Sequence, residues 1–204
     1  MSLKQVFESR RSVNFFDASK PLAEETLRNI VDLAVTAPSA FNLQPWELIA
    51  VKSEEGKQKL FENAFKQPKV LEAPVSIIVV GDRNGYADTN KEWDELAAMV
   101  GGRDNLKGYF DMTQGLYGST EERKVKFAES HGGMIAMSLM AAAEYYGVNS
   151  HPMSGIDFAG IKEAFNIGED KEVVMVITLG YFDTTKELYP RRSRKTFDEV
   201  VVLA

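Results

Sequence analysis

Two long apolar segments without a polar face limit the folds that this chain can adopt. Val75–Gly81 is a β-branched run, typical of a strand that is buried on both faces. Gly133–Tyr146 is apolar nearly all round and too short to cross a bilayer, which predicts a buried central helix. With 204 residues the chain is long enough to bury such a core, and we expect a single domain over residues 1–204.

Shorter patterns place further helices and strands around these two segments. Residues 83–127 are rich in glycine and aromatic residues and are predicted to form short helices and mobile loops. Since there is no regular βαβ rhythm and no Gly-x-Gly-x-x-Gly turn, we expect an α+β fold, a mixed central sheet with helices on its faces, and no Rossmann site. The other predicted elements are helices at Ala23–Ala37, Glu54–Phe65 and Asp157–Asn166 and strands at Trp46–Val51 and Val173–Tyr181.

The composition disfavours several kinds of chemistry. Cysteine is absent, and His131 and His151 do not form the cluster that zinc requires, so we expect no metal and assign any redox chemistry to a bound cofactor. The net charge of −6 disfavours nucleic-acid binding, and no segment has the apolar length of a transmembrane helix. The N-terminus shows no targeting pattern, so we expect a cytoplasmic protein with a small-molecule substrate.

Two basic segments are candidates for binding a phosphate group. Arg10, Arg11 and Ser12 offer two guanidinium groups and a hydroxyl, which can grip a phosphate through charge-assisted hydrogen bonds. The tail segment Arg191–Lys195 is similarly basic. The alternative for both segments is a solvated charged surface, and neither segment by itself establishes a phosphate site.

Two polar segments are candidates for recognising a ring system. His151–Gly155 follows the buried helix, so its backbone amides could point into a cavity, and we expect His151 itself to satisfy a local hydrogen bond rather than to abstract a proton. Pro38–Trp46 is bounded by prolines, and its side-chain amides suit the N3–H and carbonyl groups of a flavin pyrimidine ring. The alternative for this second segment is a turn whose polar side chains cap a helix end. Its polar side chains are Ser39, Asn42 and Gln44.

The order of these segments resembles the nitroreductase family. An Arg-Arg-Ser start, the stretch Ala-Pro-Ser-Ala-Phe-Asn-Leu-Gln-Pro-Trp, then Pro-Met-Ser-Gly and a C-terminal Arg-x-Arg follow one another between about residue 4 and the end. The resemblance implies a nitroreductase-like α+β fold and an intertwined homodimer with two FMN molecules at the subunit interface. It also implies ping-pong hydride transfer from NADH or NADPH through flavin N5 to a small acceptor.

The resemblance also implies roles for individual residues. In one subunit, the FMN phosphate and ribityl chain would be held by Arg10, Arg11, Ser12, Arg192 and Arg194. The pyrimidine end of the ring would meet Gln67 and Lys69. One ring face would lie against Pro152, Met153, Ser154 and Gly155, with an amide of Ser154 or Gly155 directed at N5. The other subunit would contribute Ser39, Asn42 and Gln44.

One position departs from the family pattern. Asn14 stands where many relatives carry Lys or Arg near the flavin N1 and C2 carbonyl, and a cation there raises the potential of the flavin. This leaves Lys69 as the nearest positive group and predicts a lower potential than in relatives with both cations.

The flavin carries the chemistry in this scheme, so no side chain is assigned a catalytic role. We expect residues 83–127 to cover the active site and residues 191–204 to form a C-terminal extension. Two alternatives stay open: an FMN-binding storage or redox-sensing protein without turnover, and a phosphate-binding module without flavin. The aromatic residues expected to stack on a planar acceptor such as a nitroaromatic or quinone are Phe41, Tyr109, Phe110 and Tyr117.

Overall fold

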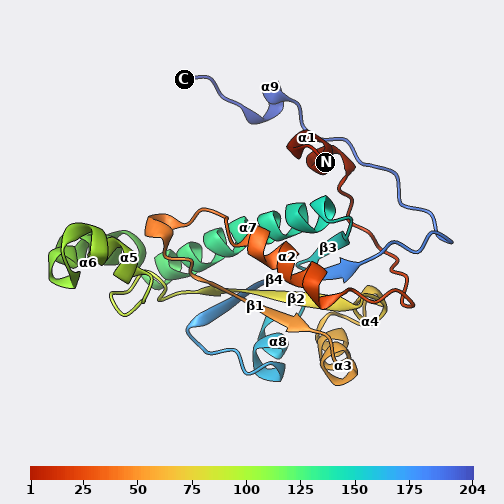
Figure 1. Cartoon of the computed structure of the whole chain (residues 1–204), viewed down its shortest axis with the longest axis horizontal. Coiled ribbons are helices and arrows are strands. Elements are labelled where there is room, and N and C mark those ends of the chain that lie inside the picture. The colour runs from red at the N-terminus through yellow and green to blue at the C-terminus, as the bar shows by residue number, and fades with distance from the viewer.

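Four strands form one sheet in the computed structural model, which describes residues 1–204 (Figure 1). The strands are β1 (Trp46–Val51), β2 (Val75–Asp82), β3 (Asn149–Met153) and β4 (Lys171–Gly180), in the spatial order β1-β2-β4-β3. Seven of the eight residues of β2 are buried, which confirms its predicted place inside the sheet.

The α+β class is confirmed, but the strands are antiparallel rather than mixed. All three neighbouring pairs run antiparallel, and parallel pairing is limited to a single bridge between Ser12 and Ser150. The reason lies in the connections, because the segments that join β1 to β2 and β3 to β4 return the chain to the end of the sheet that it has just left. Parallel pairing would need crossovers along the full length of the sheet.

Helices cover both faces of the sheet. One face is covered by α2 (Glu24–Ala34) and α7 (Glu121–Tyr145), and the other by α3 (Glu54–Asn63), α4 (Lys69–Glu72) and α8 (Phe158–Ala164), each over its own apolar cluster (Figure 1). The capping residues predicted from the sequence are confirmed, since the side chains of Ser53 and Asp157 accept backbone hydrogen bonds at the starts of α3 and α8. The remaining helices are α1 (Leu3–Ser9), η1 (Ala40–Asn42), α5 (Trp93–Val100), η2 (Arg103–Leu106), α6 (Lys107–Tyr117) and α9 (Phe197–Val200).

The buried helix α7 is longer than predicted. It begins at Glu121 rather than Gly133, because Thr120 caps its first turn and its first half is amphipathic instead of apolar all round. Gly132 lets this helix approach β4 closely, since a Cβ at this position would lie 2.4 Å from Val174. The central position of the predicted segment is confirmed by Ile135 and Leu139, which are fully buried.

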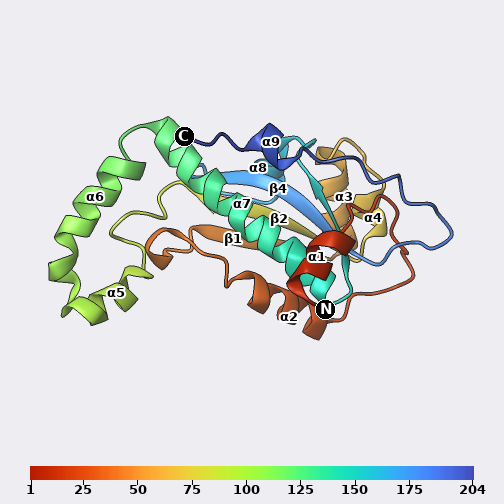
Figure 2. The same cartoon turned by 90° about the horizontal axis from the view of Figure 1, so that it is seen from above.

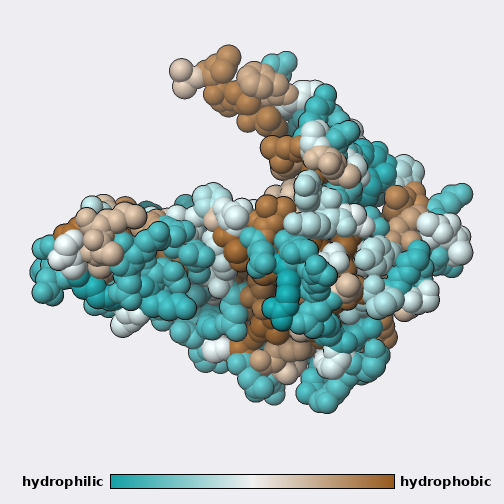
Figure 3. Space-filling model, in the orientation of Figure 1, coloured by the Kyte–Doolittle hydropathy of each residue, from teal (hydrophilic) through white to brown (hydrophobic).

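Two segments stand away from this layered body. Figure 2 shows α5 and α6 as a helical projection beyond one end of the sheet, so the short helices expected within residues 83–127 are confirmed. The tail from residue 190 is exposed throughout, and Figure 3 shows its apolar end rising clear of the body. None of the helices combines the length and the apolar character needed to cross a membrane.

Candidate functional site

The predicted site residues gather at two opposite corners of the sheet. One group lies beside β3, where Ser12 forms a bridge with Ser150. The other group is the 39–44 loop, which leads directly into Trp46 at the start of β1 (Figure 2). Along the strand direction, the two corners are separated by the length of β2 from Val75 to Gly81, which is roughly 20 Å. Across the sheet, from β3 to β1, they are roughly 14 Å apart.

At the first corner, the N-terminal segment and the tail enclose a basic cavity of about 230 Å³, here called the arginine cavity. It contains five arginines and no carboxylate, so its surface is strongly positive. All five residues that the resemblance assigns to the FMN phosphate and ribityl chain line it. Its lining residues are Arg10, Arg11, Ser12, Asn14, Tyr189, Pro190, Arg191, Arg192 and Arg194.

Arg10 is half-buried in the wall of this cavity, and its charge is incompletely compensated. Its Nη1 is buried and has no hydrogen-bond partner. Burial lowers the pKa of Arg10, Glu144 opposes this effect, and the neighbouring cations Arg191 and Arg194 add to it. A guanidinium group in this state would gain a strong interaction from a bound anion.

The tail is held at this corner by its own arginine. Arg191 donates from Nη2 to the carbonyl oxygen of Glu8 at 2.6 Å and to that of Arg10 at 3.2 Å, at the C-terminus of α1. A cation there also interacts favourably with the helix dipole. Arg11 in turn donates to the carbonyl oxygen of Tyr189. Arg191 and Tyr189 therefore shape the cavity, although neither was assigned a role from the sequence, where only the run of basic residues pointed to this part of the tail.

Next to the arginine cavity, the end of β3 brings two predicted ring contacts together. The Nε2 of Gln67 donates to the carbonyl oxygen of Gly155 at 3.0 Å, and the Nζ of Lys69 donates to the Oε1 of Gln67 at 3.2 Å. Burial lowers the pKa of Lys69, and Glu72 opposes the shift. The segment Pro152–Gly155 starts as an edge strand that the sequence did not predict, and the edge position tolerates Pro152.

His151 satisfies a local hydrogen bond, as expected. Its Nδ1 lies 3.0 Å from the carbonyl oxygen of Val13, and this contact ties the N-terminal segment to β3. The pKa of His151 falls to about 4, mainly through burial and also through the positive charges of Lys69 and Arg10, against the hydrogen bond to Val13. The ring is therefore uncharged at neutral pH.

At the second corner, the 39–44 loop has a strained backbone. Phe41, Asn42 and Gln44 adopt φ angles of 52°, 56° and 47°, a left-handed conformation that residues other than glycine rarely adopt. The backbone N–H of Gln44 donates to the Oγ of Ser39 at 2.9 Å, so the polar side chains partly stabilise a turn, as the alternative interpretation required. The side chain of Asn42 donates to Glu95 on α5 at 3.0 Å.

The candidate substrate aromatics pack around this loop. Phe41 lies 5.4 Å from Trp93 and 6.0 Å from Tyr109 between ring centroids, and Phe110 lies 5.3 Å from Trp93. Tyr117 is somewhat apart and contacts Phe127 on α7 at 4.7 Å. Phe41, Tyr109, Phe110 and Tyr117 are all half-buried, so each keeps some exposed ring surface in the isolated subunit.

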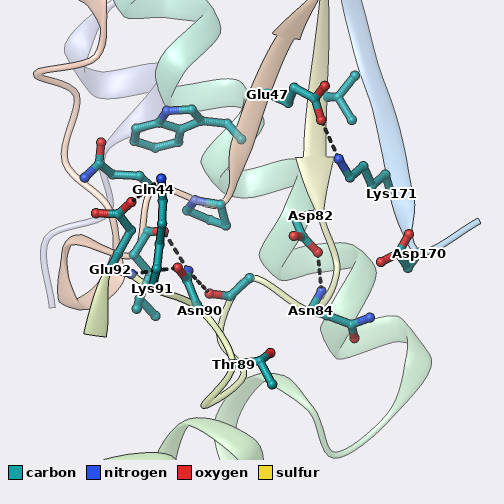
Figure 4. A pocket seen from close by; sticks show the side chains of 15 residues that line it. Gln44, Glu47, Asp82, Asn84, Thr89, Asn90, Lys91, Glu92, Asp170 and Lys171 are labelled. Atoms are coloured by element: carbon teal, nitrogen blue, oxygen red, sulfur yellow. Dashed lines mark hydrogen bonds and ion pairs between the residues drawn. The ribbon is translucent and has the colours of Figure 1, made fainter. Parts of the chain in front are cut away.

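A larger cavity, of about 600 Å³, lies beside the second corner and has different chemistry (Figure 4). Its charged lining comprises four carboxylates and two lysines, and Lys171 is already paired with Glu47. Of the predicted site residues only Gln44 lines it. A phosphate would be repelled by these carboxylates, so the smaller arginine cavity is the better anion site.

Comparison with known proteins identifies the relatives of this chain. Residues 7–181 match the model of the Nitroreductase family. A Bacillus subtilis protein named NAD(P)H nitroreductase MhqN is 33% identical over 196 residues, which cover 94% of each chain.

Solved structures agree with this relationship. The structure of the nitroreductase ydfN from Bacillus subtilis matches with a TM-score of 0.90 and 29% identity over 98% of each chain. A nitroreductase from Exiguobacterium sibiricum, solved in complex with FMN, matches with a TM-score of 0.85 and 26% identity over 100% of this chain and 98% of the other. The chain belongs to the Nitroreductase family.

Proposed function

We propose that this protein is an FMN-dependent oxidoreductase that transfers hydride from NADH or NADPH to a small acceptor such as a nitroaromatic or a quinone. The observation that carries the proposal is the arginine cavity, where Arg10 presents a buried Nη1 without a partner and no carboxylate lines the wall. This donor set fits the phosphate of FMN. The Exiguobacterium sibiricum relative solved with FMN supports the same cofactor.

The residues at the first corner divide into contacts for the phosphate and contacts for the ring. Arg10, Arg11 and Ser12 would hold the phosphate, together with Arg192 and Arg194 from the tail, and Asn14 lines the same cavity. Beside them, Gln67 and Lys69 present an amide and a cation suited to the pyrimidine edge of a flavin. Pro152, Met153, Ser154 and Gly155 would lie along one ring face.

The chemistry that FMN supplies when bound is the uptake of a hydride from a reduced nicotinamide and its delivery to an acceptor. The protein's own groups would bind and orient the cofactor and the substrates, and they would exclude water from the site. His151 is unsuited to general-base catalysis because its pKa is near 4 and its Nδ1 is engaged with Val13. We therefore assign no catalytic side chain.

We further propose a homodimer, because one flavin cannot use both corners of a single subunit. The 39–44 loop is roughly 20 Å along the strands from the arginine cavity, so its residues would reach the flavin of a second copy. Within one subunit the apolar tail has no packing partner, since Val202 is 91% exposed and Leu203 is 83% exposed. The helices α1, α2 and α7 also expose large apolar side chains, among them Phe7, Leu33 and Met134.

Size-exclusion chromatography with light scattering tests the dimer. We expect a dimer for the full chain and a partly monomeric protein after removal of residues 196–204, which deletes the apolar end of the tail. A full-length protein that is monomeric at micromolar concentration would contradict the shared site.

The cofactor and the reaction are tested with the purified full-length protein. We expect a yellow protein with a flavin spectrum, which loses its visible absorbance on anaerobic addition of NADH or NADPH and regains it when a quinone or nitroaromatic is added. A colourless protein that takes up no added FMN would overturn the proposal. Bound FMN without steady nicotinamide oxidation would favour the storage or redox-sensing alternative.

A further inference from the structure

His131 on α7 forms two hydrogen bonds that fix its ring in one state. The backbone N–H of Ala40 donates to its Nε2 at 3.1 Å, and its Nδ1 lies 2.7 Å from the carbonyl oxygen of Phe127. A backbone N–H can only donate and a carbonyl oxygen can only accept, so Nε2 carries the lone pair and Nδ1 carries the hydrogen. The residue is buried, with 7% of its surface exposed, and thus connects the 39–44 loop to the central helix.

The connected loop needs such restraints because its backbone is unfavourable by itself. Three of its residues have φ near +50°, and none of them is glycine. Besides Ala40, the loop is anchored through Leu43, which is fully buried and whose carbonyl oxygen accepts from the Nδ2 of Asn90 at 2.9 Å. His131 holds the start of the loop and Asn90 holds its end.

We infer that His131 is a positioning residue for the flavin site: by accepting the hydrogen bond from Ala40, it keeps the Ser39–Asn42 segment in the strained conformation that meets the flavin of the partner subunit. This inference rests on the proposed function. It assigns to a lone buried histidine on α7 a role in the cofactor site that its position in the sequence does not reveal. It also makes α7 the element that joins the core of one subunit to the cofactor of the other.

A purely structural role is the competing explanation, because the ring also packs at 4.4 Å on Phe127. Two amide substitutions separate the two hydrogen bonds. In H131Q the longer side chain can place an oxygen near the position of Nε2 and accept from Ala40. In H131N the shorter amide can reach only the position of Nδ1, which keeps the bond to Phe127 and loses the bond to the loop.

The experiment compares the full-length wild type, H131N, H131Q and I135V. The control Ile135→Val lies on the same helix in the fully buried core, and it lowers stability without touching the loop. The readouts are FMN affinity, the circular dichroism of the bound flavin, thermal stability, and hydrogen exchange of peptides covering residues 39–44 in the FMN-free protein.

We expect H131N to bind FMN about tenfold more weakly, to alter the flavin circular dichroism, and to exchange loop amides at least tenfold faster. H131Q and I135V should stay within about threefold of the wild type in affinity and exchange. The inference is overturned if H131N retains wild-type exchange and affinity, or if all three variants lose affinity in proportion to their loss of stability. A wild type that takes up no FMN would defeat the proposed function, and the exchange experiment would still decide whether His131 holds the loop.

Discussion

Replacement of Arg10 by methionine should change cofactor affinity and the stability of the free protein in opposite directions. Methionine keeps the unbranched apolar stem of the side chain and removes the charged guanidinium group. One charge-assisted hydrogen bond to a phosphate contributes about 1.5–3 kcal/mol, so FMN should bind about ten- to 150-fold more weakly. The FMN-free variant should be more stable than the FMN-free wild type by up to about 1 kcal/mol, because Nη1 is buried without a partner near Arg191 and Arg194.

FMN affinity can be measured by quenching of flavin fluorescence, and stability by urea unfolding of the FMN-free protein. Arg28→Met is the matched control, because Arg28 lies on α2, is exposed and pairs with Glu24 outside the arginine cavity. It should alter FMN affinity by less than about twofold. Unchanged affinity in Arg10→Met, or a clear loss of stability in its FMN-free form, would refute the reasoning that this arginine is held uncompensated for an anion.

Three further predictions concern the flavin, the packing of α7 and acid stability. Asn14→Lys should raise the flavin midpoint potential in a redox titration, because a cation favours the anionic reduced ring; an unchanged or lower potential would count against the assigned position of Asn14. Gly132→Ala should lower the free energy of unfolding by about 1–3 kcal/mol, because its Cβ would collide with Val174. Gly133→Ala should raise it by about 0.5–1 kcal/mol, because a Cβ there meets nothing within 4 Å. Equal effects of the two variants in urea unfolding would contradict the close approach of α7 to β4. The pKa of His151 falls from 6.5 to about 4 on folding, so its contribution to stability is complete above pH 6.5 and is lost as the pH falls towards 4. His151→Asn should remove this loss of stability in acid. We put the loss at no more than about 1–2 kcal/mol because the ring is partly exposed. A variant whose stability has the same pH profile as the wild type would exclude a contribution of His151.

The apolar patterns of the sequence predicted the buried strands of the sheet well. They did not predict the elements whose positions depend on tertiary contacts. The strand β1 has the predicted bounds, and β2 differs by one residue, since both consist of a single strong pattern. The edge strand β3 was missed because Pro152 and His151 interrupt any strand signal, and its pairing depends on β4. The start of α7 was missed because its first half faces solvent and carries charged residues.

For the candidate site as well, sequence patterns were predictable and tertiary arrangement was not. The chain order of the motifs could be recognised without a structure, and so could their chemistry. Their separation into two corners could not, because it follows from the strand order β1-β2-β4-β3. The left-handed backbone of Phe41 and Gln44 could not be predicted either. Local conformational preferences oppose it, and hydrogen bonds with His131 on α7 and with Asn90 hold the loop in place.

The two corners share a property that links cofactor binding to assembly. The arginine cavity collects positive charge, and the 39–44 loop stores backbone strain, so both are unfavourable in the free subunit. If FMN neutralises the first and contacts the partner's copy of the second, binding and dimerisation must strengthen each other by the same factor. The apparent affinity for FMN should then rise with protein concentration through the range in which the dimer forms. Deletion of residues 196–204 should move this range to higher concentration without touching Arg10 or the loop. An FMN affinity that is independent of protein concentration while the dimer dissociates would show that a single subunit holds the cofactor alone.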